Sequence, residues 1–170
     1  GAVGHLEGMP NLRLRVKYVA PLARNAEGEV HILADPQSRQ PFIKQTIEGE
    51  LYKYIGGICK NLECYPIKIG GYIDHLHILC LLSKKIATMK LLEEIKSHSS
   101  GWIKTKGEDL KNFYWQDGYG AFSVSPSSVK TVVAYIENQH EHHRKIIFQE
   151  EYRAFLKEYE VEYDERYVWD

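Results

Sequence analysis

The sequence predicts a single α+β domain with an antiparallel sheet, and three observations support this prediction. First, residues 65–69 and 71–81 are apolar, strand-length segments joined by two glycines, which is the pattern of an antiparallel hairpin. Second, residues 42–62 and 88–104 repeat apolar side chains at the spacing of helices that pack on a sheet. Third, the elements follow one another as strand, helix, strand, strand, helix and strand. This βαββαβ order is typical of the ferredoxin-like or RRM-like plait, which has helices on one face of the sheet and an open second face.

Composition and length agree with one intracellular domain. The chain has 170 residues, of which 44% are hydrophobic, and this is enough to bury a substantial core. No apolar run could span a bilayer and no signal-peptide pattern is present, so we expect a soluble, cytoplasmic protein. Three cysteines, Cys59, Cys64 and Cys80, lie in apolar segments without metal-ligand spacing. We expect them to be reduced core residues.

The charge is small overall but uneven along the chain. The formal net charge is −1, whereas residues 150–170 hold eight acidic and three basic residues. Residues 1–149 therefore carry about +4. A basic body with an acidic tail is compatible with a polyanionic ligand but does not prove one.

Two segments near the amino terminus have the pattern of a strand. Residues 1–10 have no pattern and are compatible with a vector-derived remnant, whereas residues 12–19 alternate between apolar and basic side chains. Residues 29–33 form the second such segment, and the two strands could pair as a hairpin. We therefore divide the chain into an amino-terminal extension over 1–28, with an extra strand, and a single domain over 29–170.

The two predicted central helices differ in how clearly they are marked. Gly56 and Gly57 lie inside the helix at 42–62 and argue mildly against its continuity. Thr88 is a suitable N-cap for the helix at 88–104. The polar side of this second helix carries Lys90, Lys96, Ser97, Ser100 and Lys104. Such a side is as often an ordinary solvated surface as a contact with DNA.

The last predicted helix covers residues 126–143 and follows a β segment with a glycine-rich bend at 113–124. Its packing stripe is apolar and consists of Val129, Val132, Val133 and Ile136. A different side carries, at three- and four-residue spacing, Tyr135, Asn138, Gln139 and His142. Taken alone, Tyr135 would be a half-buried packing residue and Gln139 a surface amide. A short helix at 150–158 precedes an aromatic tail that we expect to dock on the domain or on a partner subunit.

Two histidines one residue apart lie inside the apolar segment 71–81. Successive side chains of a strand point to opposite faces, so His75 and His77 share one face and can both reach one ion. A central strand buries its side chains, and buried imidazoles need partners. Two interpretations remain open for the pair taken alone. The histidines are either satisfied by hydrogen bonds or are two ligands of a metal that needs at least a third.

Five motifs follow one another along the chain: Asp74-His75-Leu76-His77, Ser99-Ser100-x-Trp102-Ile103, Trp115-Gln116-x-Gly118-Tyr119-Gly120-Ala121-Phe122-Ser123-Val124-Ser125, Tyr135-Ile136-x-Asn138-Gln139-x-Glu141-His142-His143 and Tyr163-Asp164-Glu165-Arg166-Tyr167. In this order they resemble the single-tyrosine HUH transposases, a family that moves insertion sequences as single-stranded DNA. The resemblance covers nearly all of residues 29–170, and residues 1–28 depart from the family pattern. The spacing to Arg39-Gln40-Pro41-Phe42-Ile43 favours residues 29–33 as the first strand of the domain.

The resemblance implies an HUH-type site and its chemistry. In that site His75, His77 and Gln139 bind Mg²⁺ or Mn²⁺, and Tyr135 is the nucleophile. A phenol is a poor nucleophile at neutral pH, so a cation must polarise the scissile phosphate. Attack on DNA would give a 5′-phosphotyrosine bond and a free 3′-hydroxyl, and reversal by another 3′-hydroxyl would join strands. The covalent intermediate keeps the bond energy, so no nucleotide cofactor is required, and the sequence has no Walker-type loop.

The resemblance also implies the partners of the protein. Family members recognise DNA hairpins near the ends of the element, and they act as homodimers in which the tyrosine helix of one subunit serves the histidines of the other. We assign contacts with hairpin phosphates to Lys96, Ser97, Ser100 and Lys104. The expected setting is the cytoplasm of a prokaryotic cell, in association with the nucleoid.

Two other functions compete with the transposase. A metal-dependent phosphoesterase would use His75 and His77 to activate water and would leave Tyr135 with a structural role. A domesticated or non-mobile HUH protein would bind or nick DNA without moving an element. The presence of Gln139 with the other three site residues argues against such decay.

Overall fold

The computed structural model describes residues 28–36, 40–116 and 120–143, together with the separate positions 150, 153, 154 and 157. The described strands are β1 (Gly28–Ala34), β2 (Tyr65–Tyr72), β3 (His75–Leu82) and β4 (Gly120–Val124). They form one antiparallel sheet in the order β2-β3-β1-β4. The described helices are α3 (Gln45–Asn61), α4 (Thr88–Lys104), α5 (Val129–Glu137) and α6 (Gln139–His142), with 3-10 turns η3 (Glu108–Leu110) and η4 (Pro126–Ser128). This topology confirms the predicted ferredoxin-like α+β fold.

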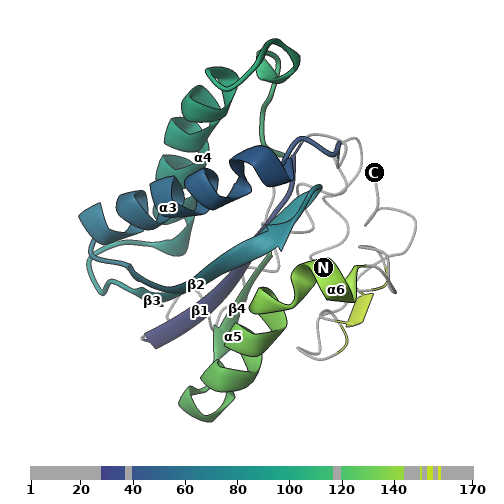
Figure 1. The fold of residues 1–170 in the computed structure, drawn as a ribbon. Helices are drawn as coiled ribbons and strands as arrows, with labels where there is room; N and C mark the ends of the chain where they lie inside the picture. The colour runs from purple at the N-terminus through teal and green to yellow at the C-terminus, as the bar shows by residue number, and fades with distance from the viewer. Residues whose placement is uncertain are drawn as a thin grey trace, which may run out of the picture.

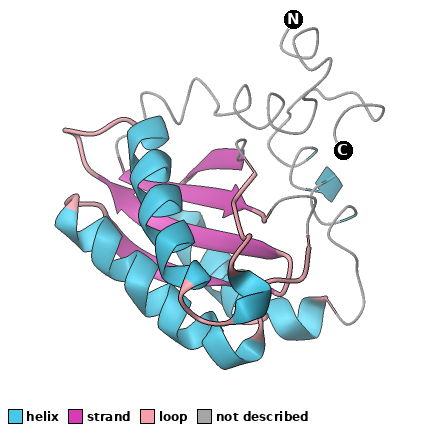
Figure 2. Ribbon diagram, turned by 90° about the horizontal axis from the view of Figure 1, so that it is seen from above, coloured by secondary structure: helices cyan, strands magenta, loops and turns pink. Residues whose placement is uncertain are grey.

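The sheet has two buried faces of different character. One face packs against α3 and α4, which lie side by side over the sheet (Figures 1 and 2). Strand residues that share this face are Val30, Ile32, Ala34, Leu76, Ile78, Cys80 and Leu82, and they meet Ile47, Leu51, Ile55, Leu91, Leu92 and Ile95 from the two helices. Burial of this apolar surface supplies the main stabilisation of the domain.

The second face carries the histidines and is covered in part by α5 (Figure 1). We expected this face to be open. The side chains of Leu79 in β3 and Val124 in β4 face away from the main core. They pack with Ile136 of α5 into a separate, small apolar cluster. An open face would leave these apolar side chains in water, so the apolar stripe of α5 covers them.

The β2–β3 hairpin turns three residues later than predicted. We expected Gly70 and Gly71 to end the strand, but β2 runs through them and the turn is at Ile73 and Asp74. A Cβ atom on Gly70 would lie 2.8 Å from Cγ2 of Ile136, and one on Gly71 would overlap the carbonyl oxygen of His75. These glycines therefore serve close packing, with α5 and with β3, rather than the turn.

The helix boundaries follow the predicted pattern with two corrections. Gly56 and Gly57 do not interrupt α3, and Gly56 is buried against Pro66 and Ile69 of β2. The N-cap of α4 is Ala87 rather than Thr88, which is the first helical residue and is buried. The predicted helix at 126–143 is a 3-10 turn followed by α5 and α6, which are separated at Asn138.

Other expectations concern residues at the edges of the described chain. The strand expected at 29–33 is β1, whereas the strand expected at 12–19 lies outside the described residues. The same holds for most of the helix expected at 150–158 and for the aromatic tail. Cys59, Cys64 and Cys80 are buried free thiols, as expected. Among the described residues, no helix has both the length and the apolar character that a membrane crossing requires.

Candidate active site

Three histidines from two neighbouring strands lie on the sheet face that α5 covers. His75 and His77 of β3 point to this face because they are two residues apart in a strand. His31 of β1 shares the face, and all three side chains are fully buried. The rings of His75 and His77 meet edge to face with centroids 5.1 Å apart. The site therefore rests on the two central strands, the most firmly held part of the sheet.

The side-chain oxygen of Gln139 lies at the centre of this cluster. It is 2.8 Å from Nε2 of His75, 3.0 Å from Nε2 of His77 and 3.1 Å from Nε2 of His143. An amide oxygen has two lone pairs and accepts at most two good hydrogen bonds. At least one of the three imidazole nitrogens therefore faces the oxygen without donating to it. Converging lone pairs of this kind are what a cation site needs.

The tautomer of His75 follows from its neighbour in the β2–β3 turn. Nδ1 of His75 lies 2.8 Å from Oδ1 of Asp74. A carboxylate only accepts hydrogen bonds, so Nδ1 carries the proton and donates it to Asp74. In the neutral ring Nε2 then carries the lone pair and points to Gln139. Carboxylate–histidine pairs of this kind orient the imidazole ligands of metals in proteins.

Tyr135 of α5 lies next to the histidine pair of its own chain. Its ring packs edge to face against His77, with centroids 5.7 Å apart. The hydroxyl is 3.4 Å from Nε2 of His142. The backbone carbonyl of Tyr135 accepts a hydrogen bond of 3.4 Å from the side-chain amide of Gln139. The end of α5 and the start of α6 thus bring Tyr135 and Gln139 together, as the predicted spacing required.

Two further contacts hold α6 in place over the end of β2. His140 makes an ion pair with Glu48 of α3 at 2.9 Å when it is protonated. The ring of His143 stacks on Tyr72 of β2, with centroids 5.1 Å apart and planes 18° apart. These contacts join α6 to the body of the domain. They keep Gln139 pressed onto the strand histidines.

The donor set fits a small divalent cation. Among the described residues, no three His, Cys, Asp or Glu side chains form a group that could hold a metal. A metal site on His75 and His77 would therefore require Gln139 as a further donor. Octahedral ligands placed about 2.1 Å from Mg²⁺ lie about 3.0 Å from one another. The Gln139 oxygen keeps this spacing from both Nε2 atoms. Two imidazoles also suit Mn²⁺ or another transition ion.

The residues predicted to contact DNA lie on α4, which packs on the opposite face of the sheet. Ser97 and Lys104 are exposed. Lys96 donates a hydrogen bond to the carbonyl of Gln116, and Ser100 donates a weak one of 3.5 Å to the carbonyl of Phe113. Lys96 and Ser100 thus hold the segment that leads to β4. The structure does not bring these four residues to the histidines.

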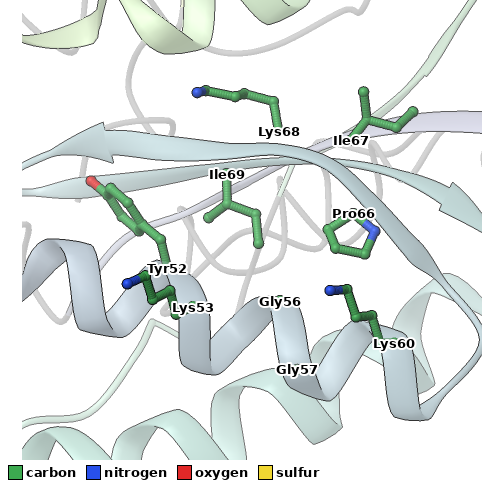
Figure 3. A pocket seen from close by; sticks show the side chains of 9 residues that line it. All are labelled: Tyr52, Lys53, Gly56, Gly57, Lys60, Pro66, Ile67, Lys68 and Ile69. Atoms are coloured by element: carbon green, nitrogen blue, oxygen red, sulfur yellow. The ribbon is translucent and has the colours of Figure 1, made fainter.

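A groove between α3 and β2 has basic residues along it (Figure 3). Lys53 and Lys60 come from α3, and Pro66 and Ile69 face the helix from β2. Lys68 points away from α3 in this view and pairs with Glu137 of α5 at 3.2 Å. The groove follows the edge of the sheet, on the side of α3 and away from the histidines.

Several residues of the site were not singled out from the sequence. His31 and His143 adjoin His77 and Gln139, and Asp74 fixes His75. One signal was available for His31, because an alternating strand places it on one face with Glu29 and Leu33. The sequence does not state which strand lies beside β3, so this alternation alone could not predict that His31 lies next to His77.

The plait and the site together define the class of protein, an α+β domain that brings two strand histidines, a glutamine and a tyrosine to one sheet face. The family model of IS200-like transposases matches residues 25–139, which is well over half of the chain. The chain therefore belongs to the IS200-like transposase family. This confirms the resemblance seen in the motifs, and the matched span includes His75, His77, Tyr135 and Gln139.

Solved structures of low sequence identity share the fold. A candidate transposase from Deinococcus radiodurans R1 matches with a TM-score of 0.52 and 17% identity, over 65% of this chain and 89% of that one. A REP-associated tyrosine transposase bound to a REP hairpin matches with a TM-score of 0.55 and 16% identity, over 71% of this chain and 70% of that one. No curated protein matches the chain.

Proposed function

We propose that this transposase cleaves and rejoins single-stranded DNA through a covalent bond between Tyr135 and a 5′-phosphate. The observation that carries the proposal is the meeting of Tyr135 and Gln139 with His77 on one buried sheet face. A tyrosine with a structural role would not need a buried amide and two buried imidazoles beside it. The family assignment supports DNA transesterification as the reaction.

The proposed step is a transesterification at phosphorus. The phenol oxygen of Tyr135 forms a bond to the phosphorus while the bond from phosphorus to the 3′ oxygen breaks. The phenol proton passes to Nε2 of His142, which lies 3.4 Å from the hydroxyl, and the departing 3′ oxygen takes up a proton from solvent water. Attack by another 3′-hydroxyl reverses the step and joins two strands. The energy of the phosphodiester is conserved, so no nucleotide cofactor is needed.

We propose His75, His77 and Gln139 as the ligands of Mg²⁺ or Mn²⁺. Their nitrogens and oxygen are neutral donors, which leave the ion its full charge toward a phosphate. When bound, such an ion polarises the scissile phosphate and lowers the cost of forming a phenolate. The protein's own contribution is to hold the three donors and the phenol in one arrangement before DNA arrives.

We propose single-stranded DNA with hairpins as the substrate. The REP-associated tyrosine transposase of similar fold is bound to a REP hairpin, and this supports the same class of ligand here. Ser97 and Lys104 of α4 are exposed and can contact phosphates, as can Lys53 and Lys60 along the groove. A homodimer that shares its site between subunits remains part of the proposal.

The test is the capture of a covalent adduct. The full chain is incubated with a library of single-stranded hairpin oligonucleotides and Mn²⁺, and the linked residue is identified by mass spectrometry. We expect an adduct that survives denaturation, with the DNA on Tyr135, and we expect Y135F to form none while it still binds Mn²⁺. An undiminished adduct in Y135F would refute the nucleophile. Cleavage without any adduct would support the phosphoesterase instead, and absence of cleavage would support an inactive DNA-binding protein.

A further inference from the structure

His31 contacts the site, but the proposed function gives it no role. The register of β1 against β3 pairs Leu33 with His77 and His31 with Leu79. His31 is thus the diagonal neighbour of His77 on the same sheet face, a separation that ring side chains can bridge. The two rings stack with centroids 5.1 Å apart and planes 27° apart. Phe122 of β4 packs against His31, with ring centroids 6.4 Å apart.

The contact between the two rings is a hydrogen bond. Nε2 of His31 lies 2.9 Å from Nδ1 of His77, so one proton is shared between two imidazole nitrogens. If the proton belongs to His31, a neutral His77 must carry its own proton on Nε2, the atom that faces Gln139. If it belongs to Nδ1 of His77, Nε2 of His77 is a bare lone pair. Only the second arrangement leaves His77 able to bind a cation.

We propose that His31 is a positioning residue that accepts the Nδ1 proton of His77 and thereby keeps Nε2 of His77 unprotonated toward Gln139. The inference rests on the metal site of the proposed function. It makes the two strand histidines equivalent, because each then donates from Nδ1 to a fixed acceptor, Asp74 for His75 and His31 for His77. Outer partners of this kind orient ligands and set their affinity.

The charge of the group that accepts the Nδ1 proton of His77 affects how strongly the site attracts a phosphodiester. Asp74 is a carboxylate at the rim of the site, and its side chain is 26% exposed, whereas His31 is a fully buried imidazole. A buried carboxylate in place of His31 would be costly and would weaken the positive potential offered to a phosphodiester. An imidazole orients His77 without adding negative charge.

The first part of the test measures the affinity of the full, metal-free chain for Mn²⁺ alone, by calorimetry. We expect H31L, which keeps an apolar volume but has no acceptor, to bind about 10- to 100-fold more weakly than the parent. We expect H31Q, which offers an amide oxygen at a similar reach, to recover most of the affinity. F122L is the matched control, since it disturbs the packing around His31 without removing a hydrogen bond, and it should bind as the parent does.

The second part of the test determines the tautomer in the metal-free parent from the ¹⁵N shifts of the His77 ring. We expect a protonated Nδ1 and a bare Nε2, and this measurement needs no variant to fold. A proton on Nε2 of His77, parental affinity in H31L, or affinity in H31Q as low as in H31L would each overturn the inference. The H77A variant distinguishes a failure of the proposed metal site from a failure of the role proposed for His31. Parental Mn²⁺ affinity in H77A overturns the metal site itself, whereas a loss in H77A with none in H31L overturns the role of His31 alone.

Discussion

The side-chain oxygen of Gln139 lies 2.8 Å from Nε2 of His75, although 64 residues separate the two in sequence. This contact joins the strand that carries the histidines to the helix pair that carries Tyr135. It depends on the break at Asn138, which lets α6 start afresh and turn Gln139 into the sheet face. The buried position of Gln139, with 1% exposure, is unusual for an uncharged amide on a short helix. The role of metal ligand that we propose for Gln139 would account for this burial.

Removal of the amide should weaken metal binding. We expect Q139A to bind Mn²⁺ more than about tenfold more weakly than the parent, because loss of even an outer partner costs about 10- to 100-fold. Q139E, which keeps an oxygen at the same reach, should bind at least as well as the parent. Calorimetry on the metal-free chain measures both. Equal affinity of Q139A and the parent would remove Gln139 from the proposed ligands.

Exchange of the tyrosine between subunits can be tested by mixing two inactive variants. Tyr135 contacts His77 within one chain, so H77A and Y135F each lack a complete site of their own. In a homodimer that exchanges the tyrosine helix, the intact tyrosine of H77A meets the intact histidines of Y135F. We expect adduct formation to return on mixing, as measured on a denaturing gel. No recovery in mixed dimers would mean that each chain uses its own tyrosine.

We expect the close packing of α5 on β2 to require a glycine at position 70. A Cβ atom there would lie 2.8 Å from Cγ2 and 3.0 Å from the backbone oxygen of Ile136. We expect G70A to lower the free energy of unfolding by about 1–3 kcal/mol and to reduce adduct formation, because Tyr135 precedes Ile136. The control is G57A in α3, where a Cβ atom meets nothing within 4 Å. Urea denaturation should show G57A to be stabilised by about 0.5–1 kcal/mol.

A buried hydrogen bond joins two of the sequence motifs and should contribute to stability. The indole nitrogen of Trp115 donates to Oγ of Ser99 at 2.9 Å, and both residues are buried. We expect S99A to lower the free energy of unfolding by about 1–3 kcal/mol, because the indole N–H loses its partner away from water. The exposed S97A on the same helix should change it by less than about 0.5 kcal/mol. Similar values for the two variants in urea denaturation would contradict this.

The stability of the fold should decrease at high pH because of its buried thiols. Burial, with a smaller effect of Cys64, raises the pKa of Cys59 from 9.0 to about 12. In the unfolded chain the thiol ionises near its ordinary pKa, so the folded state binds more protons above that pH. The contribution of the Cys59 thiol to the free energy of unfolding is complete below about pH 9. It is lost as the pH rises toward 12, by up to about 1.4 kcal/mol per pH unit. Urea denaturation from pH 8.5 to 10.5 should show a smaller slope for C59A than for the parent.

Much of the fold could be predicted because periodicity records which side chains are buried. The helix expected at 88–104 is α4, which differs from the prediction only in its N-cap, and the strand expected at 29–33 is the centre of β1. The prediction that Gly70 and Gly71 end the strand was wrong. A glycine that ends a strand and one that allows a neighbouring helix to pack closely look the same in sequence. The distinction depends on Ile136, which lies more than sixty residues further along the chain.

The candidate site shows the same division. Alternation in a strand places His75 and His77 on one face, and helical spacing places Tyr135 beside Gln139, so the sequence determined both pairs and the family motifs that contain them. The tertiary structure alone decided that the two pairs meet, that α5 covers the histidine face, and that His31 supplies the partner of His77. The physical reason is that periodicity describes each element by itself. Which elements lie side by side depends on strand pairing and on the shared burial of distant apolar surfaces.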